Sequence, residues 1–262
     1  MNHKQIKKWF SEFTALYEGR RISLPIPLQR KLRHSHAVAL NAAGIASELL
    51  MEPEHVRLAE MAGLLHDIGR WPQYETFQTF RDSESKDHGA LGADVLKQHR
   101  VLADCSDHER ACLEAAVRHH NAKDVPSSVK GDALRFTQIV RDSDKLDIYE
   151  IVIGLMQSGE MLADPTLRLN TDPNGPLTPE AMLEVRERKS VSFRHIHSLN
   201  DFLLTLLSWT YDINCQPTYN RLANRKVLAR LSQFLPHTTD VESLFQAADM
   251  WVRTCKAANP NE

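Results

Sequence analysis

The stretch AGLLHDIGRW, residues 62–71, joins the apolar face of a predicted helix to an adjacent histidine and aspartate. His66 follows Ala62 by four residues and therefore lies on the buried side of that helix. Asp67 comes directly after it, and Gly69 stands in the position of a helix-ending residue. Buried polar groups need compensating partners, and adjacent residues at a helix end could bind one metal ion together.

Outside this stretch, apolar residues recur at spacings of three and four, and the chain of 262 residues contains 10 Gly and 12 Pro. This period is typical of helices that face a core, and no strand pattern is convincing. The chain is therefore predicted to be all-α, with a polar loop at residues 71–87. We expect one helix at residues 4–18 and a second helix that contains residues 34–49. Further helices are expected at 54–67, 89–99, 108–121, 132–158, 179–190, 198–212, 217–235 and 239–257.

The sequence TDPNGPLTPE, residues 171–180, is a predicted loop that separates two parts of the chain. We expect residues 1–165 to form the helical core that carries the metal site. Residues 166–262 are predicted to form a C-terminal helical extension packed on that core.

The composition is that of an ordinary globular protein, with 42% hydrophobic residues and a formal net charge of −2. A net charge this close to zero gives the chain no overall positive potential that would attract nucleic acid or an anionic membrane. The N-terminus lacks a signal sequence, and no apolar run approaches the roughly 18 residues of a membrane span. The four cysteines form no CxxC pair, which argues against a zinc ribbon or a disulfide framework. We therefore expect a cytoplasmic protein with no membrane partner.

His34 is a second polar residue on an apolar helix face. It precedes Val38 and Ala42 at steps of four, so it points toward the core. His36 lies about 200° further round the helix, so the two imidazoles cannot both face one centre. We choose His34 as the candidate ligand.

Asp144 likewise interrupts an apolar stripe. It follows Phe136 and Val140 at four-residue steps and precedes Ile148, and a carboxylate buried there is costly unless it is compensated. Asp142 points elsewhere by the same angular argument and is held as a weaker candidate.

His88 and the pair His119 and His120 complete the set of candidate ligands. On an ideal helix only one member of such a pair points fully inward, unless the site lies at the helix end. Imidazole nitrogens and carboxylate oxygens suit divalent transition metals such as Mn, Fe, Ni, Co or Zn.

This ordered set resembles the HD phosphohydrolase superfamily, whose fold is a helical bundle. The resemblance covers roughly residues 30–155, although no GYP tripeptide follows the HD pair and Arg70 stands where many relatives have lysine. The strings that carry it are HSHAVALNAAGIA, AGLLHDIGRW, DHGALGADVL, VRHHN and RDSDKLDIYE.

The resemblance implies one metal held by His34, His66, Asp67 and Asp144. In branches with two metals, such as HD-GYP phosphodiesterases and CRISPR-associated HD nucleases, the aspartate of the HD pair bridges the two metal ions. It therefore implies a second metal held by Asp67, His88, His119 and His120.

The predicted function is a metal-dependent phosphohydrolase that cleaves a phosphomonoester or phosphodiester of a nucleotide or related metabolite through a metal-activated water. Asp67 would orient the nucleophile, and Arg70, Lys145 or Arg118 would stabilise phosphoryl charge. One alternative is a nuclease on single-stranded nucleic acid, which the near-neutral charge disfavours. Another is a non-catalytic regulator that binds metal or a nucleotide. The natural substrate, the metal and the oligomeric state stay open.

Overall fold

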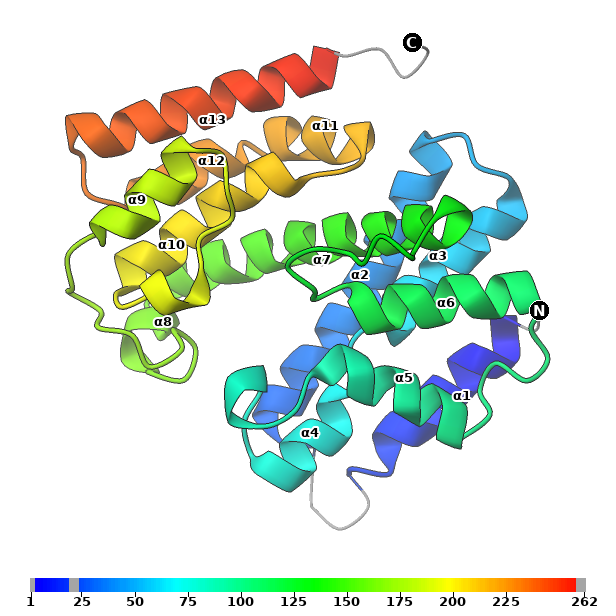
Figure 1. The fold of residues 1–262 in the computed structure, drawn as a ribbon. Helices are drawn as coiled ribbons and strands as arrows, with labels where there is room; N and C mark the ends of the chain where they lie inside the picture. The colour runs from blue at the N-terminus through cyan, green and yellow to red at the C-terminus, as the bar shows by residue number, and fades with distance from the viewer. Residues whose placement is uncertain (1–2, 19–23, 258–262) are drawn as a thin grey trace. The chain divides into compact units, whose positions relative to one another are not determined.

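The structure is a computed structural model of the chain and describes residues 3–18 and 24–257. Within these ranges the fold is all-helical with no strand, as predicted (Figure 1). The α-helices are α1 His3–Ala15, α2 Ile26–Glu48, α3 Pro53–Leu65, α4 Arg70–Phe77, α5 His88–Gln98, α6 Asp107–His119, α7 Gly131–Ser158, α8 Glu160–Ala163, α9 Pro179–Arg186, α10 Leu199–Ser208, α11 Gln216–Asn224, α12 Val227–Leu231 and α13 Thr239–Ala257.

The chain divides into two compact units, Met1–Asp147 and Ile148–Glu262. Long helix α7 belongs to both, because the division falls within it. The domain boundary that the sequence predicts, between residues 165 and 166, lies further along the chain and stays a prediction.

Helices α2 and α3 pack along each other in the first unit. The predicted apolar stripe of α2 is confirmed, since His34, Val38 and Ala42 are all buried. Gly63 permits the close approach, because a Cβ there would lie 2.9 Å from both Ala39 Cα and the Val38 carbonyl oxygen. A side chain at this position would push the two helices apart.

The predicted loop at residues 71–87 is wrong in its first half, where α4 forms. The segment is polar, and α4 buries only two side chains, Trp71 and Gln73, so it has no apolar stripe that would predict a helix. Trp71 is fully buried and packs edge-on against the Phe10 ring, with 5.9 Å between the ring centroids. Gln78 ends α4 in the left-handed region with φ 54°.

Gly69 lies in the turn between α3 and α4, but its φ of −67° is not left-handed. The prediction that Gly69 ends the preceding helix is wrong, because α3 ends at Leu65 and Gly69 directly precedes α4. Its role is a close approach, because a Cβ there would overlap the His88 carbonyl oxygen and lie 2.5 Å from Gly92 N. The absent side chain allows α5 to pack directly against the turn that carries His66 and Asp67.

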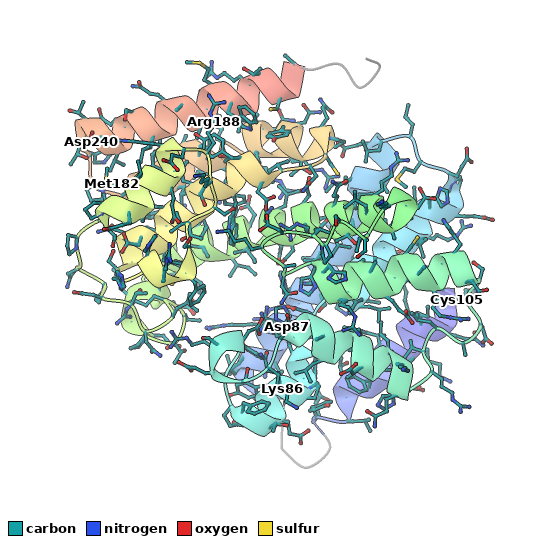
Figure 2. All side chains as sticks on the ribbon, viewed as in Figure 1. Lys86, Asp87, Cys105, Met182, Arg188 and Asp240 are labelled. Atoms are coloured by element: carbon teal, nitrogen blue, oxygen red, sulfur yellow. The ribbon has the colours of Figure 1, made fainter. Side chains whose placement is uncertain are left out.

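Side-chain caps fix where α5 and α6 begin. Asp87, labelled in Figure 2, accepts a hydrogen bond from Ala90 N at the start of α5. Ser106 and Glu109 form a reciprocal capping box at the start of α6. The two helices pack against each other, and α6 also packs on α3. His88 is thereby placed at the first residue of α5, and His120 follows the last residue of α6.

In the second unit α10 is the most apolar helix, with five buried leucines, and it packs against α9. Ser198 and Asp201 form its capping box, and Asp201 also accepts hydrogen bonds from Thr178. The predicted helix at 217–235 is interrupted, because Lys226 adopts φ 51° between α11 and α12. The predicted helix at 198–212 changes to a 3-10 turn after Ser208.

Helix α13 packs on α11, where Trp251 Nε1 donates to Tyr219 Oη at 3.3 Å. The guanidinium of Arg188, labelled in Figure 2, lies 4.8 Å from the centroid of the Trp251 ring. Among the helices that the structure describes, none has the length and apolar character needed to span a bilayer.

Candidate metal centre

Four imidazoles from four places in the first unit meet at one point. His34 comes from α2, His66 directly follows α3, His88 begins α5 and His120 directly follows α6. Each is at most 4% exposed. The Nε2 atoms of His34 and His66 are 3.3 Å apart, and those of His88 and His120 are 3.0 Å apart. The imidazoles thus form two pairs, each with its Nε2 atoms facing.

Backbone carbonyls set the orientation of one imidazole in each pair. His66 Nδ1 donates to the Gly63 oxygen at 2.7 Å, and His120 Nδ1 donates to the Val117 oxygen at 2.9 Å. Because a carbonyl oxygen can only accept, the proton of each ring lies on Nδ1. In the neutral ring, Nε2 then points a lone pair into the centre.

Carboxylates orient the other imidazole in each pair. His34 Nδ1 lies 2.6 Å from Asp147 Oδ2, and His88 Nδ1 lies 2.7 Å from Asp82 Oδ2. Histidines that ligate metals usually donate their outer ring N–H to such a partner. All four Nε2 atoms are therefore available to the centre.

The facing Nε2 atoms test whether the residues fit a metal. In the neutral rings of His88 and His120 both Nε2 atoms are acceptors, and at 3.0 Å they repel unless a cation, either a proton or a metal ion, lies between them. The donor set of imidazoles and carboxylates is one that divalent transition metals prefer. The residues therefore fit a metal site.

Asp67 lies between the two pairs and is 1% exposed. Its Oδ2 is 3.7 Å from His34 Nε2 and 3.6 Å from His66 Nε2. Its Oδ1 is 3.3 Å from His88 Nε2 and 3.6 Å from His120 Nε2. One carboxylate oxygen thus faces each pair, which is the arrangement that a bridging ligand requires.

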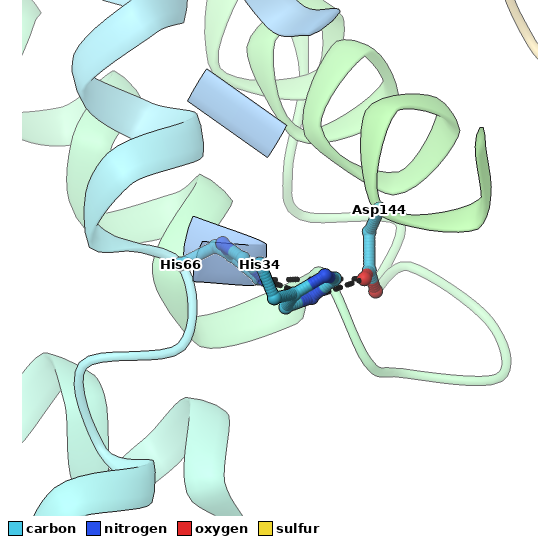
Figure 3. A group of neighbouring side chains, drawn as sticks. All are labelled: His34, His66 and Asp144. Carbon is cyan, nitrogen blue, oxygen red and sulfur yellow. Dashed lines mark hydrogen bonds and ion pairs between the residues drawn. The ribbon is translucent and has the colours of Figure 1, made fainter. Parts of the chain in front are cut away.

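Asp144, from α7, adds a carboxylate to the pair formed by His34 and His66, and Figure 3 shows the three side chains directed at one another. Its Oδ1 lies 3.0 Å from His34 Nε2 and 3.9 Å from His66 Nε2. The same oxygen is buried and makes no hydrogen bond of good geometry among the described residues. A buried acceptor in this state is the kind of atom that a cation would satisfy.

In the absence of a metal ion, the pKa shifts of His34, His66 and His88 differ in direction. Burial lowers the pKa of His66 to about 3 and, together with Arg70, that of His88 to about 4. Burial and the positive charge of Lys31 oppose the charged form of His34, but its interactions with the Asp144 and Asp147 carboxylates outweigh both and raise its pKa to about 9. In the metal-free state His34 therefore carries the proton that separates its Nε2 from that of His66.

Burial would raise the pKa of Asp67, but Lys31, His66 and Arg70 outweigh it and hold this pKa well below its usual range. Asp67 is therefore an anion at neutral pH, able to share its charge between two cations.

His119 is not brought into this cluster. It is partly exposed, whereas His120 is buried and faces His88. His36 also points elsewhere, since its ring packs on the edge of Phe10 with 5.7 Å between the ring centroids. Asp142 is buried but belongs to none of the candidate ligand groups among the described residues.

Arg70 borders the centre, with Nε 3.3 Å from Asp67 Oδ1 and Nη1 donating to the Phe80 carbonyl oxygen at 2.6 Å and to Asp82 at 3.2 Å. Lys145 follows Asp144 on α7 and is buried, with 8% of its surface exposed.

Sequence reasoning missed three residues of this site: Lys31, Asp82 and Asp147. Lys31 Nζ lies 2.7 Å from Asp67 Oδ2. A signal existed for two of them, because Lys31 is three residues before His34 and Asp147 is three after Asp144, spacings that share a helix face. Asp82 lies in a 3-10 turn, for which helical periodicity gives no signal.

Two further groups have ligand atoms within 4.8 Å of one another: His66, Asp67 and His120, which links the two pairs, and Asp82, Asp87 and His88. Asp82 is already hydrogen-bonded to His88 Nδ1, and Asp87 caps α5. Both carboxylates therefore have structural partners, and we interpret the second group as support for His88.

Residues 32–149 match the family model described as HD domain. Ribonuclease Y of Clostridium tetani (strain Massachusetts / E88) is 31% identical over 156 residues, which cover 55% of this chain and 27% of the relative.

Ribonuclease Y 1 of Pediococcus pentosaceus (strain ATCC 25745 / CCUG 21536 / LMG 10740 / 183-1w) is 34% identical over 93 residues, 36% of this chain and 14% of the relative. The chain thus spans about a quarter or less of the length of these relatives. The comparison with solved structures found no match.

Proposed function

We propose that this chain hydrolyses a phosphomonoester or phosphodiester of a nucleotide or related metabolite with two divalent metal ions, and the match of residues 32–149 to the HD-domain model supports a metal-dependent hydrolase. The observation that carries the proposal is the position of Asp67, whose two oxygens face two separate pairs of Nε2 atoms.

In this proposal one site consists of His34, His66, Asp67 Oδ2 and Asp144. The other consists of Asp67 Oδ1, His88 and His120, and its smaller set of protein ligands leaves room for water or substrate. His119, which the resemblance adds to the second site, is left outside.

A bound pair of divalent ions supplies Lewis acidity and lowers the pKa of a coordinated water. The residues of this chain orient the ligands and exclude bulk water from the centre. Asp147 and Asp82 hold the imidazoles of His34 and His88 in place. The four imidazoles and Asp67 are at most 4% exposed, and this burial excludes bulk water and strengthens each charge interaction inside.

Arg70 has two parts in the proposed reaction. Its Nε–H contact orients Asp67, and its positive charge beside the centre stabilises charge that develops on phosphoryl oxygens. We propose the same electrostatic role for Lys145, whose burial strengthens its field.

A second candidate function is hydrolysis of single-stranded RNA, because both curated relatives are named ribonucleases. The formal net charge of −2 disfavours it, since nucleic-acid affinity depends on neutralising phosphates. Binding of oligoribonucleotides that weakens steeply with salt, together with cleavage, would favour this function over a small substrate.

The test begins with metal analysis of the purified chain. It continues with a panel of aryl phosphates, nucleotides and oligoribonucleotides in the presence of Mn, Ni, Co, Fe or Zn. Asp67→Asn keeps the shape of the side chain but removes the charge, so we expect turnover to fall by about 100-fold or more. Asp94→Asn is the matched control, because Asp94 is 73% exposed on α5.

Turnover that survives Asp67→Asn would overturn the proposed centre. Metal binding by the unaltered chain without turnover of any phosphoester would instead identify a non-catalytic metal-binding regulator.

A further inference from the structure

Lys31 places a positive charge directly on the candidate bridging ligand. Its Nζ is 2.7 Å from Asp67 Oδ2, and its side chain is 22% exposed. That oxygen is the one that faces His34 and His66. A metal ion at this oxygen and the Lys31 ammonium would repel each other, because two cations would then contact one carboxylate oxygen.

The same Asp67 oxygen cannot serve Lys31 and a metal ion equally well. In the metal-free centre Lys31 compensates a carboxylate that is 1% exposed and would otherwise be costly to bury. When Asp67 Oδ2 and the Nε2 atoms of His34 and His66 act as ligands, that compensation is no longer needed. The Lys31 ammonium is then repelled from the oxygen.

The Phe80 ring, whose centroid also lies 5.6 Å from the Arg70 guanidinium carbon, gives the released ammonium a second group to contact. Lys31 Nζ is already 5.8 Å from the centroid of the half-buried Phe80 ring, within the range of a cation–π contact. Arg70 fixes this segment, since its Nη1 donates to the Phe80 carbonyl oxygen. The lysine side chain has a flexible stem and three donors, so a small rotation redirects it without moving α2.

We propose that Lys31 is an exchangeable cation. It neutralises Asp67 in the metal-free centre, leaves Asp67 when metal binds, and then contacts the anionic phosphoryl oxygens of the substrate from beside Phe80. The last step rests on the proposed function, whereas the exchange with metal does not.

The exchange is tested by titrating the metal-free chain of 262 residues with Mn²⁺ alone. We expect Lys31→Met to bind Mn²⁺ about tenfold more tightly than the unaltered chain, a change that corresponds to ~1.4 kcal/mol. Lys31→Arg keeps the charge and should bind within about threefold of the unaltered chain. The matched control is Lys86→Met, which removes an exposed charge in the same unit (Figure 2) and should change affinity by no more than about twofold.

A fixed ion pair that only holds α2 against Asp67 predicts the opposite result. Removing it would let Asp67 shift and weaken Mn²⁺ binding. Unchanged or weaker binding by Lys31→Met, with helicity retained in circular dichroism, therefore overturns the exchange.

The substrate contact is read from KM at saturating Mn²⁺ with an aryl phosphate or nucleotide that the unaltered chain hydrolyses. We expect Lys31→Met to raise KM by about tenfold, because a charge-assisted hydrogen bond to the phosphoryl group is lost. Lys31→Arg should restore most of that loss, and an unchanged KM for Lys31→Met overturns this contact. If the unaltered chain hydrolyses no phosphoester, the proposed function and this contact both fall, while the Mn²⁺ titration still decides the exchange.

Discussion

Replacing Gly69 by alanine tests the close packing that brings the two halves of the candidate centre together. The added Cβ would overlap the His88 carbonyl oxygen and lie 2.5 Å from Gly92 N. Both contacts are to backbone, so no side-chain rotation relieves them, and α5 must retreat. At Gly92 N the retreat is at least about half an ångström, and overpacking of this kind costs about 1–3 kcal/mol.

The retreat of α5 should affect one metal site more than the other. His88 is the first residue of α5, and its Nε2 lies 3.3 Å from Asp67 Oδ1. Metal sites tolerate displacements of only about 0.5 Å. We therefore expect the second metal to bind about tenfold or more weakly, while the site with His34, His66 and Asp144 keeps its affinity.

Chemical unfolding followed by circular dichroism measures the stability, and metal analysis after dialysis measures the stoichiometry. Gly154→Ala on α7 is the control, since a Cβ there meets nothing within 4 Å, and it should stabilise by about 0.5–1 kcal/mol. A Gly69→Ala variant with unaltered stability and full metal content would refute the packing argument.

Three further predictions concern single groups of the centre. His120→Gln should remove one metal ion per chain, whereas His119→Gln should leave the metal content unchanged; equal losses would contradict the choice of His120. Asp82→Ala frees the His88 imidazole, and titration calorimetry should show a loss of second-metal affinity of about 10- to 100-fold, which an unchanged isotherm would exclude. Metal affinity should rise about tenfold per pH unit up to about pH 9, because the raised pKa of His34, about 9, requires a proton to leave before Nε2 can ligate; calorimetry in buffers of different ionisation enthalpy would show no proton release if this is wrong.

The raised pKa of His34 makes the stability of the metal-free chain change with pH in the opposite direction to its metal affinity. Its folded-state pKa of about 9 lies above the ordinary value of 6.5, so protonated His34 stabilises the fold fully below pH 6.5. That contribution is lost as the pH rises through 9. Metal-free protein should thus lose stability across the pH range in which its metal affinity grows.

Helical periodicity predicted most of the fold, because long amphipathic helices carry a strong signal in the spacing of apolar residues. It failed for α4, whose eight residues bury only Trp71 and Gln73. It also joined α11 and α12 into one helix, since the left-handed conformation of Lys226 has no marker such as glycine.

For the candidate site, the apolar stripes predicted on α2 and α7 indicated His34 and Asp144, which the structure brings together. Angular reasoning predicted that only one of His119 and His120 points fully inward unless the site lies at a helix end, and the resemblance implied both as ligands. Choosing His120 required the position where α6 ends. Asp82 could not be found from periodicity, because the contact with His88 depends on how Gln73 and Arg70 hold the segment after α4.

The outer hydrogen bonds of the four imidazoles give each candidate metal site one fixed ligand and one adjustable ligand. His66 and His120 donate to backbone carbonyls of their own helical turns, so no substitution at another side chain removes their partners. His34 and His88 rely on Asp147 and Asp82, and each of these carboxylates can be changed by a single codon. A substitution of either carboxylate would therefore change how strongly the imidazole of one site donates to its metal, without changing the imidazoles of the other site. In the proposed two-metal centre, such a substitution would tune one metal site while every ligand of both sites stays in place.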